Sequence, residues 1–122
     1  MIIGVGTDII EIPRIEKAIK RTPGLLEKIF TQEEIKLAGD GRRIESLAGY
    51  FAAKEAMGKA LGTGVRGFSL KDIEIYKDDL GKPYVHLSGR AENISTLKGV
   101  SKIHLSISHS KENAIALIVL EG

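Results

Sequence analysis

The segment from Tyr50 to Gly64 constrains the fold most, because it joins a helical pattern to a glycine-rich end. On a helix that turns by about 100° per residue, it contributes to an apolar stripe made of Leu47, Tyr50, Phe51, Met57, Gly58 and Leu61. Lys54 falls inside this stripe. A lysine on a buried face costs free energy unless its ammonium group reaches solvent or meets an anion. We therefore expect Lys54 either to pack its stem along the core or to bind an anion.

Glu55 and Lys59 lie four residues apart on the flank of the stripe. Surface ion pairs with this spacing are common and weak, so the spacing alone favours a structural interpretation. The glycine-rich segment Gly62-Thr63-Gly64 is explained most simply as a helix stop. Two glycines also let backbone amides approach a phosphate, although neither a Walker lysine pattern nor a G-x-G-x-x-G motif is present.

The composition is that of a single globular domain spanning residues 1–122, with 43% apolar and 28% charged side chains. The net charge of +2 gives no support for a nucleic-acid partner. The absence of cysteine excludes disulfides, thiolate metal sites and a cysteine nucleophile. No apolar run approaches the roughly 20 residues of a membrane span, and no signal-peptide pattern is present. We therefore expect a cytoplasmic protein that does not act on a membrane.

The first nine residues alternate with period two and predict a strand. One face of this strand carries Gly4, Gly6 and Asp8, so another backbone or a ligand can come close to the Asp8 carboxylate. Helix capping is the alternative role for Asp8. The run from Asp8 to Glu11 matches an acidic N-cap with glutamate at N3, and Pro13 fits a first helical turn. One side chain cannot easily fill both roles.

The helix predicted from Pro13 to Arg21 directs three isoleucines, Ile12, Ile15 and Ile19, toward a core. Another face of this helix carries the basic residues Arg14, Lys17 and Arg21, at positions i, i+3 and i+7. Such a stripe is usually only a solvated face, but it is also what docking of an acidic helical partner requires. Two short helices are predicted next, over residues 25–30 and 31–38, the second opened by a capping box at Thr31. The long central helix follows from about Arg43 to Leu61.

The C-terminal half predicts two hairpins joined by a helix. The first hairpin pairs residues 73–76 with 84–87, and the second pairs 103–107 with 114–120. The helix over residues 89–97 should be capped by Ser88 and should direct Ala91, Ile94 and Leu97 inward. Because the last strand is apolar on both faces, it must be covered by helices or by another subunit.

The three histidines give no argument for a metal centre or a catalytic triad. His109 ends the first strand of the second hairpin, between two serines, where a histidine is usually a hydrogen-bonded turn residue. His104 and His86 have less to suggest a function.

Four motifs in order along the chain resemble the holo-acyl-carrier-protein synthases, the short-chain type of phosphopantetheinyl transferase. They are Gly6-Thr-Asp8-Ile-Ile-Glu11-Ile, Phe51-Ala-Ala-Lys54-Glu55-Ala-x-x-Lys59-Ala-x-Gly62-Thr63-Gly64, Asp79-x-x-Gly81-Lys82-Pro83 and Ser106-Ile-Ser-His109-Ser110. The resemblance covers essentially the whole chain. It implies an α+β fold in which a long central helix packs on a mainly antiparallel sheet, completed by formation of a homotrimer with active sites at subunit interfaces.

The resemblance also implies a reaction, in which phosphopantetheine passes from coenzyme A to a serine hydroxyl of apo acyl carrier protein. Asp8 and Glu55 are then the Mg²⁺ ligands, which suits a cation that prefers hard oxygen atoms. Glu55 is the expected base, acting directly or through a metal-bound water, and Lys59 neutralises charge on the reacting phosphate. The residues expected to contact coenzyme A are Lys54, Lys59, Gly62, Thr63, Gly64, Pro83 and His109.

The basic stripe of Arg14, Lys17 and Arg21 becomes the expected grip on the acidic carrier protein. One position departs from the pattern. Relatives often carry a basic residue immediately before the phenylalanine of the Phe-x-x-Lys-Glu segment, and this chain has Tyr50 there. One expected phosphate contact is therefore in question.

Two other classes of protein share some of these features. A metal-dependent phosphatase or nuclease could use the same side chains, but it usually needs more carboxylates than Asp8 and Glu55. A non-catalytic trimeric binding module for an acidic helical partner would explain the basic stripe and the apolar strand. It would leave Lys54, Glu55 and Lys59 as an ordinary helix surface.

Overall fold

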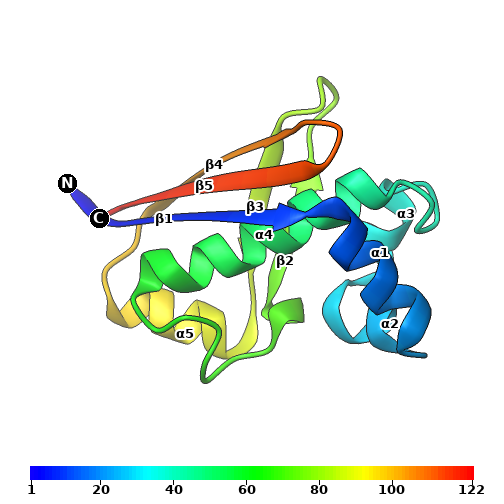
Figure 1. The fold of residues 1–122 in the computed structure, drawn as a ribbon. Coiled ribbons are helices and arrows are strands. Elements are labelled where there is room, and N and C mark those ends of the chain that lie inside the picture. The colour runs from blue at the N-terminus through cyan, green and yellow to red at the C-terminus, as the bar shows by residue number, and fades with distance from the viewer.

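A three-stranded antiparallel sheet covers one side of a long central helix in the computed structural model, which describes residues 1–122 (Figure 1). The sheet has the order β1 (Ile2–Glu11), β5 (Asn113–Glu121) and β4 (Lys102–His109). The helix beneath it is α4 (Ile44–Leu61). The predicted α+β class and the predicted hairpin of β4 and β5 are confirmed.

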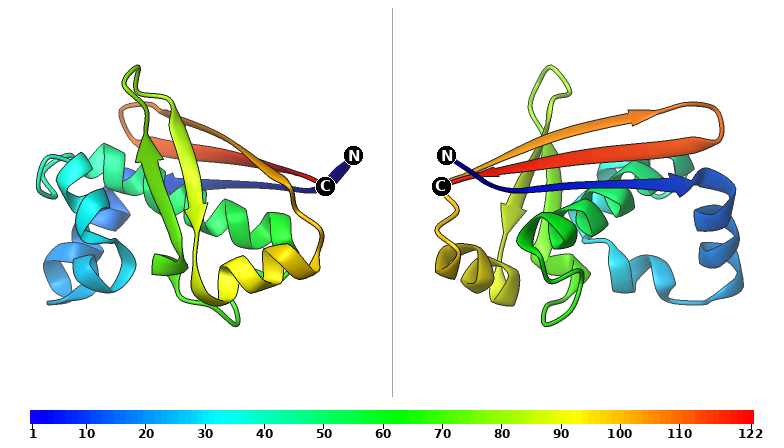
Figure 2. Two further views of the ribbon diagram at one scale, coloured as in Figure 1. Left: turned by 180° about the vertical axis from the view of Figure 1, so that it is seen from behind. Right: turned by 60° about the vertical axis from the view of Figure 1, so that its left-hand side comes forward.

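Two further groups of elements surround α4 (Figure 2). Three short helices gather near its N-terminal end: α1 (Ile12–Arg21), α2 (Leu25–Ile29) and α3 (Gln32–Leu37). On another side of α4 lie the hairpin of β2 (Ile73–Lys77) and β3 (Pro83–Leu87), the 3₁₀ turn η1 (Leu70–Asp72) and α5 (Gly89–Leu97), and β3 packs against β4 at the edge of the three-stranded sheet. The first predicted hairpin is thereby confirmed as well.

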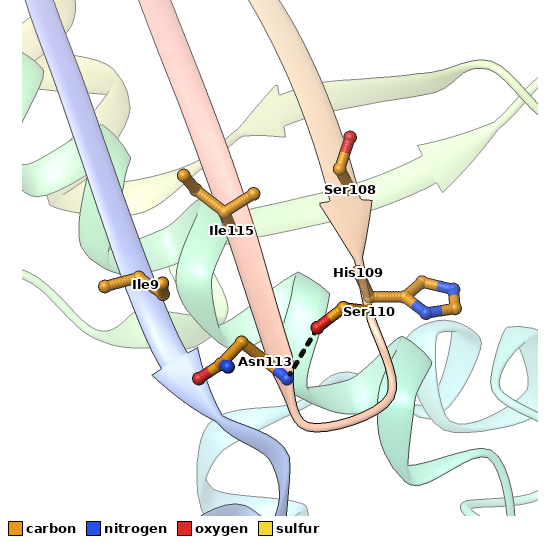
Figure 3. Close-up of a pocket in the computed structure, with 6 residues that line it drawn as sticks. All are labelled: Ile9, Ser108, His109, Ser110, Asn113 and Ile115. Carbon is orange, nitrogen blue, oxygen red and sulfur yellow. Dashed lines mark hydrogen bonds between the residues drawn. The ribbon is translucent and has the colours of Figure 1, made fainter.

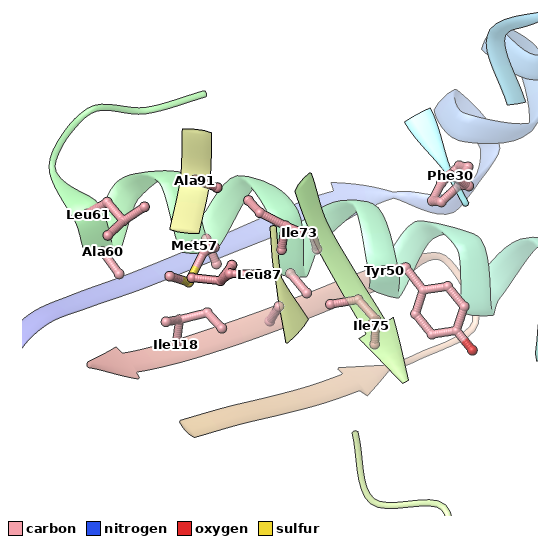
Figure 4. Close-up of a cluster of buried hydrophobic side chains, with 14 of the residues drawn as sticks. Phe30, Tyr50, Met57, Ala60, Leu61, Ile73, Ile75, Leu87, Ala91 and Ile118 are labelled. Carbon is pink, nitrogen blue, oxygen red and sulfur yellow. The ribbon is translucent and has the colours of Figure 1, made fainter. Parts of the chain in front are cut away.

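Helix α4 is buried around most of its circumference, which corrects the expectation of a single apolar stripe. The helix is rich in small residues: Ala52, Ala53 and Ala56 have no exposed surface. Ala56 and Ala60 lie against β1. Larger side chains fill the space between α4 and the β2–β3 hairpin, among them Met57, Ile73 and Leu87 (Figure 4). A helix enclosed on both sides needs small residues wherever a strand must come close.

The glycines of β1 set the distance between that strand and the helix. A Cβ atom on Gly6 would lie 2.0 Å from the backbone oxygen of Ala56, and one on Gly4 would lie 2.2 Å from that of Ala60. Only glycine permits contacts this close. The approaching backbone predicted opposite this face is therefore α4.

Neither the helix cap considered as the alternative role of Asp8 nor the cap predicted for Ser88 is formed. Strand β1 continues to Glu11, which occupies the N-cap position of α1, so Asp8 lies within a strand and caps nothing. Ser88 stands at the N-cap of α5 but makes no side-chain cap bond, and Leu97 of that helix is 87% exposed instead of inward. The capping box of α3 is confirmed, because Thr31 and Glu34 each accept the backbone N–H of the other.

The inner face of β5 packs on α4, whereas the outer face of the sheet remains open in the single chain. Its exposed apolar side chains are Ile3, Val5, Ile9, Ile115 and Leu117, each between 41% and 64% exposed. The two-sided apolar pattern of β5 is therefore covered by the helix on one side only.

None of the helices combines the length and the apolar character that a membrane crossing needs.

Candidate active site

The three predicted catalytic residues meet where β1 passes over α4. Asp8 lies on the same face of β1 as Gly6, and Lys59 lies one turn after Glu55 on the helix. The Lys59 ammonium donates hydrogen bonds to Asp8 Oδ1 and to the backbone oxygen of Thr7, and each donor–acceptor distance is 3.0 Å. The close approach at Gly6 makes this contact possible, because it brings the helix flank within reach of a strand carboxylate.

The site is partly shielded from water. The side chains of Asp8 and Lys59 are 18% and 54% exposed, and Glu55 is half-buried. Burial raises the pKa of Glu55, the nearby Asp8 carboxylate raises it further, and Lys59 opposes both effects. The site therefore combines two carboxylates that repel each other with one cation at their edge.

Two neighbouring carboxylates fit a divalent cation that takes oxygen ligands. No cluster of three or more histidine, aspartate and glutamate side chains is positioned to hold a metal. Asp8 and Glu55 would therefore provide two ligands, and the others would come from water or from a substrate. This donor set suits Mg²⁺, which usually keeps several waters, better than a two-metal centre.

Lys54 is not available to a phosphate, which corrects its assignment to coenzyme A. The residue has no exposed surface, and its ammonium lies 2.9 Å from Glu34 Oε1. It also donates to the backbone oxygens of Leu70 and Ile73. Burial lowers the pKa of Lys54, and the Glu34 carboxylate opposes that shift. Of the two roles predicted for this lysine, the structure shows anion binding, and the anion is the Glu34 carboxylate.

The glycine segment after α4 acts as a helix stop. Gly62 has a φ of 82°, in the left-handed region, and its N–H donates to carbonyls of the last turn. The N–H groups of Thr63 and Gly64 both donate to the backbone oxygen of Gly58. These three amides are therefore occupied within the chain, so the expected contact of Gly62, Thr63 and Gly64 with coenzyme A stays a prediction of close backbone approach and not of donation by these N–H groups. Gly62 still borders a cavity of about 380 Å³ together with Ile3 and Lys98.

A second group of predicted residues meets on the other flank of α4. Pro83 and His109 both line a cavity of about 190 Å³ between the N-terminal half of α4 and the β2–β3 hairpin. Its other lining residues are Glu45, Ser46, Tyr50, Lys77, Gly81 and Ile107. No local pattern pointed to Lys77, which stands in strand β2 and reaches the cavity through tertiary packing alone.

His109 also borders a shallow cavity of about 370 Å³ at the end of the outer sheet face (Figure 3). Ile9 and Ile115 form its apolar floor, and the turn after β4 forms its rim. The hydrogen bond in this turn runs from the Asn113 N–H to Ser110 Oγ, so the neighbouring serine fills the role predicted for the histidine. The His109 ring points away from the paired strands (Figure 3).

The two groups of residues do not share one cleft in a single chain. Asp8 pairs with Ala116, and Ala116 pairs with Ile107, which lines the second cavity. Asp8 and Ile107 are therefore about 10 Å apart across the sheet, at two strand spacings. The buried small residues of α4 fill the space beneath this row. A ligand that contacts both groups would have to pass around the sheet or extend between two copies of the chain.

The basic stripe is exposed on α1, where Arg14, Lys17, Ala18 and Arg21 line a groove of about 350 Å³. Arg14 also lies 3.8 Å from Glu11, and both side chains are largely exposed. Because α1 follows β1 directly, the groove begins a few residues after Asp8. The predicted basic surface is thus close along the chain to the carboxylate site.

Comparison with known families agrees with this architecture. A family model described as the 4′-phosphopantetheinyl transferase superfamily matches residues 4–118. The chain belongs to this superfamily, and the resemblance predicted from its motifs is confirmed. The holo-[acyl-carrier-protein] synthase of Clostridium novyi is 57% identical over 99% of this chain and 88% of its own length. That of Clostridium beijerinckii is 56% identical over 100% of this chain and 99% of its own.

Solved structures give the same result. A crystal structure of holo-[acyl-carrier-protein] synthase from Neisseria meningitidis has a TM-score of 0.91 and 37% identity, and covers 100% of both chains. A Bacillus anthracis synthase in complex with CoA (3′,5′-ADP) has a TM-score of 0.81 and 44% identity over 98% of this chain and 96% of its own.

Proposed function

We propose that this protein is a holo-acyl-carrier-protein synthase. It transfers phosphopantetheine from coenzyme A to a serine hydroxyl of apo acyl carrier protein and releases adenosine bisphosphate. The observation that carries this proposal is the meeting of Asp8, Glu55 and Lys59 between β1 and α4 in a chain of this superfamily. The names of the similar proteins support the same activity, and coenzyme A is the ligand of a structural relative. Both substrates are intracellular, so we place the reaction in the cytoplasm.

Glu55 is the base in the proposed reaction. The serine oxygen forms a bond to the β-phosphorus of coenzyme A, and the bond from that phosphorus to the adenosine bisphosphate oxygen breaks. The serine proton passes to Glu55, directly or through a water, and in the metal-free chain burial and the Asp8 carboxylate raise the pKa of this acceptor. A half-buried position beside a second carboxylate is what gives Glu55 this property.

Lys59 and Asp8 position and neutralise the transferring group. Lys59 is fixed by Asp8 and the Thr7 carbonyl, which leaves one of its three N–H groups to donate to phosphate oxygens. Asp8 and Glu55 would hold Mg²⁺, which when bound supplies further neutralisation of phosphate charge. Electrostatic stabilisation of this kind dominates phosphoryl transfer in general.

We propose that the active unit is a homotrimer with sites between subunits. The open apolar face of the sheet offers the surface for it, and the two groups of ligand-facing residues lie on opposite flanks of α4. Contact between copies would bring the Asp8 group of one chain toward the His109 group of the next.

A Val5→Asp change in the exposed face should reduce the measured mass in solution to one chain of 13.2 kDa and abolish transfer. Retained activity in a monomer would contradict this arrangement.

The groove of Arg14, Lys17 and Arg21 is the proposed docking surface for the acidic carrier protein. Arg14→Glu should raise the KM for carrier protein and should weaken the dependence of the rate on salt. Lys20→Glu is the matched control, because Lys20 lies on the same helix, pairs with Glu16 and is outside the groove. An equal effect of both changes would point to net charge instead of docking.

Intact-mass spectrometry tests the activity. Apo acyl carrier protein should gain the mass of one phosphopantetheine when it is incubated with this protein, coenzyme A and Mg²⁺, and should not change with a chelator present. No mass gain with several acidic carrier proteins would favour a non-catalytic binding module. Release of inorganic phosphate from coenzyme A without modification of the carrier would favour a phosphatase.

A further inference from the structure

A polar pair lies at the edge of the open apolar face of the sheet. His104 Nε2 and Glu121 Oε1 are 2.5 Å apart, and their side chains are 54% and 40% exposed. His104 pairs with Val119 in the strand register, and Val119 pairs with Val5 on its other side. Directly paired residues point to the same face of a sheet, so these three form one row on the outer face.

A second copy that covers the apolar part of this row would also cover its polar end. Val5 is 57% exposed and lies two strand spacings, about 10 Å, from His104. A stable interface usually covers about 800 Å² on each partner, which is far more than this row needs. The association proposed for the outer face would therefore take the His104–Glu121 pair out of water.

Few other charges surround the pair. The charged or titratable groups that face it from the neighbouring elements are Lys102 of β4, Lys82 and Tyr84 of β3, and the two chain ends at Met1 and Gly122. Lys102 stands opposite Glu121 in the register, but the ion pair that Glu121 forms is with His104. Of the side-chain types in this group, histidine is the one that ordinarily changes its charge between pH 5 and 8.

The histidine already acts on the carboxylate in the single chain. Its hydrogen bond holds the pKa of Glu121 below the ordinary value, and the positive charges of His104 and Lys102 act in the same direction. Water screens this pair while it is exposed, so it contributes little by itself. Once it is covered, an ionised carboxylate beside a neutral imidazole costs free energy, whereas an imidazolium compensates the charge.

We propose that the His104–Glu121 pair makes the association of subunits depend on pH. This inference rests on the proposed homotrimer and names a means of regulating it. Association is tightest where Glu121 is ionised and His104 is protonated. It weakens as the pH rises through the range in which histidine loses its proton, and again when acid protonates Glu121. Because the proposed active site is shared between subunits, the transfer rate at low protein concentration follows the same profile.

Sedimentation velocity at constant Mg²⁺ and ionic strength tests the proposal without reference to activity. The protein concentration at which half of the chains are assembled should rise by about tenfold from pH 6 to pH 8, because a charge-assisted hydrogen bond becomes an ordinary one. His104→Gln keeps a hydrogen-bond donor that does not titrate, so this variant should lose the pH dependence. His104→Lys keeps a positive charge and should remain as well assembled at pH 8 as at pH 6.

His86→Gln is the matched control. His86 is also exposed and stands opposite a glutamate, Glu74, but this pair belongs to the β2–β3 hairpin and lies outside the outer face of the sheet. The variant should therefore assemble with the same pH dependence as the unchanged protein. A pH dependence that persists in His104→Gln would assign the effect to another group, such as the Met1 ammonium or His109, and would overturn the proposal.

The remaining outcomes separate this inference from the proposed function. A trimer whose assembly does not change between pH 6 and pH 8, or a chain that is monomeric at every pH, would contradict the inference. Modification of the carrier in the mass assay would in either case leave the transferase function standing. If assembly responds to pH as expected but the carrier is never modified, the transferase function fails and the pH-dependent association is retained.

Discussion

Helix α4 carries two lysine–carboxylate pairs that are nearly identical in distance and opposite in environment. Lys54 Nζ lies 2.9 Å from Glu34, and Lys59 Nζ lies 3.0 Å from Asp8. Both side chains of the first pair are fully buried, whereas those of the second are 54% and 18% exposed. Contact distance therefore says little about what a charged pair does, and the surroundings decide it.

The inner pair has no bonding capacity left. An ammonium group has three donors, and Lys54 uses them on Glu34 and on the backbone oxygens of Leu70 and Ile73. The Glu34 carboxylate also accepts the N–H groups of Thr31 and Ile75. The pair joins α3, α4 and β2, and it has no contact with solvent through which to act on a ligand.

The outer pair keeps one lysine donor free and lies beside a carboxylate with a raised pKa. It can therefore act on a ligand that arrives from solvent, while contributing little to folding. The inner pair therefore contributes to stability and the outer pair to chemistry, although both lysines belong to the same helix.

The largest effect should come from the base beside the outer pair. Glu55→Gln keeps the size of the side chain but removes the proton acceptor, and the transfer rate should fall by about 100-fold to 10,000-fold. The free energy of unfolding should not fall, because the glutamine removes a carboxylate that Asp8 repels. Rates from the mass assay and urea unfolding provide the two measurements. A variant that retains the full transfer rate would exclude Glu55 as the base.

Lys54→Met should affect stability. Breaking a fully buried ion pair leaves an uncompensated carboxylate, so the free energy of unfolding should fall by about 3–5 kcal/mol. The KM for coenzyme A should remain unchanged in the fraction that folds. Urea unfolding measures the first quantity and steady-state kinetics the second. A raised KM without loss of stability would restore the discarded role of Lys54 in substrate binding.

Lys59→Met should show the opposite pattern. Loss of a hydrogen bond from a charged donor to phosphate should lower kcat/KM by about tenfold to a hundredfold. The free energy of unfolding should change by less than about 1 kcal/mol, because the pair is exposed. The same two measurements apply, and a loss of stability equal to that of Lys54→Met would remove the contrast between the pairs.

The smallest effect concerns the protonation of Glu55. In the metal-free protein its pKa should lie above the ordinary value of 4.5, and NMR titration of the side-chain carboxyl measures it. Asp8→Asn should lower this pKa because it removes a repelling charge, whereas Lys59→Met should raise it. Since the folded state holds the proton more tightly than the unfolded chain, ionisation of Glu55 reduces stability as the pH rises through the folded pKa. A pKa at or below 4.5 would contradict the half-buried site.

The sequence alone was sufficient for the helices and strands, and its family resemblance implied that Asp8, Glu55 and Lys59 share one site. Hydrophobic periodicity predicted the helices and strands, because burying one face of either element requires apolar residues at a fixed spacing along the chain. Gly4 and Gly6 indicated a close approach to β1, and helical spacing placed Glu55 and Lys59 on one flank. The two failed caps had equally good local patterns, but strand pairing with β5 extended β1 to Glu11 and competed successfully for that segment.

Tertiary structure decided what could not be read from spacing. The Glu34 carboxylate reaches Lys54 from twenty residues away, and the last turn of α4 occupies the amides of Gly62, Thr63 and Gly64. The β2–β3 hairpin brings Lys77 over Tyr50, although neither residue signals the other along the chain. Local patterns fix which groups are available, but long-range packing determines which of them are satisfied internally and which remain free to bind a ligand.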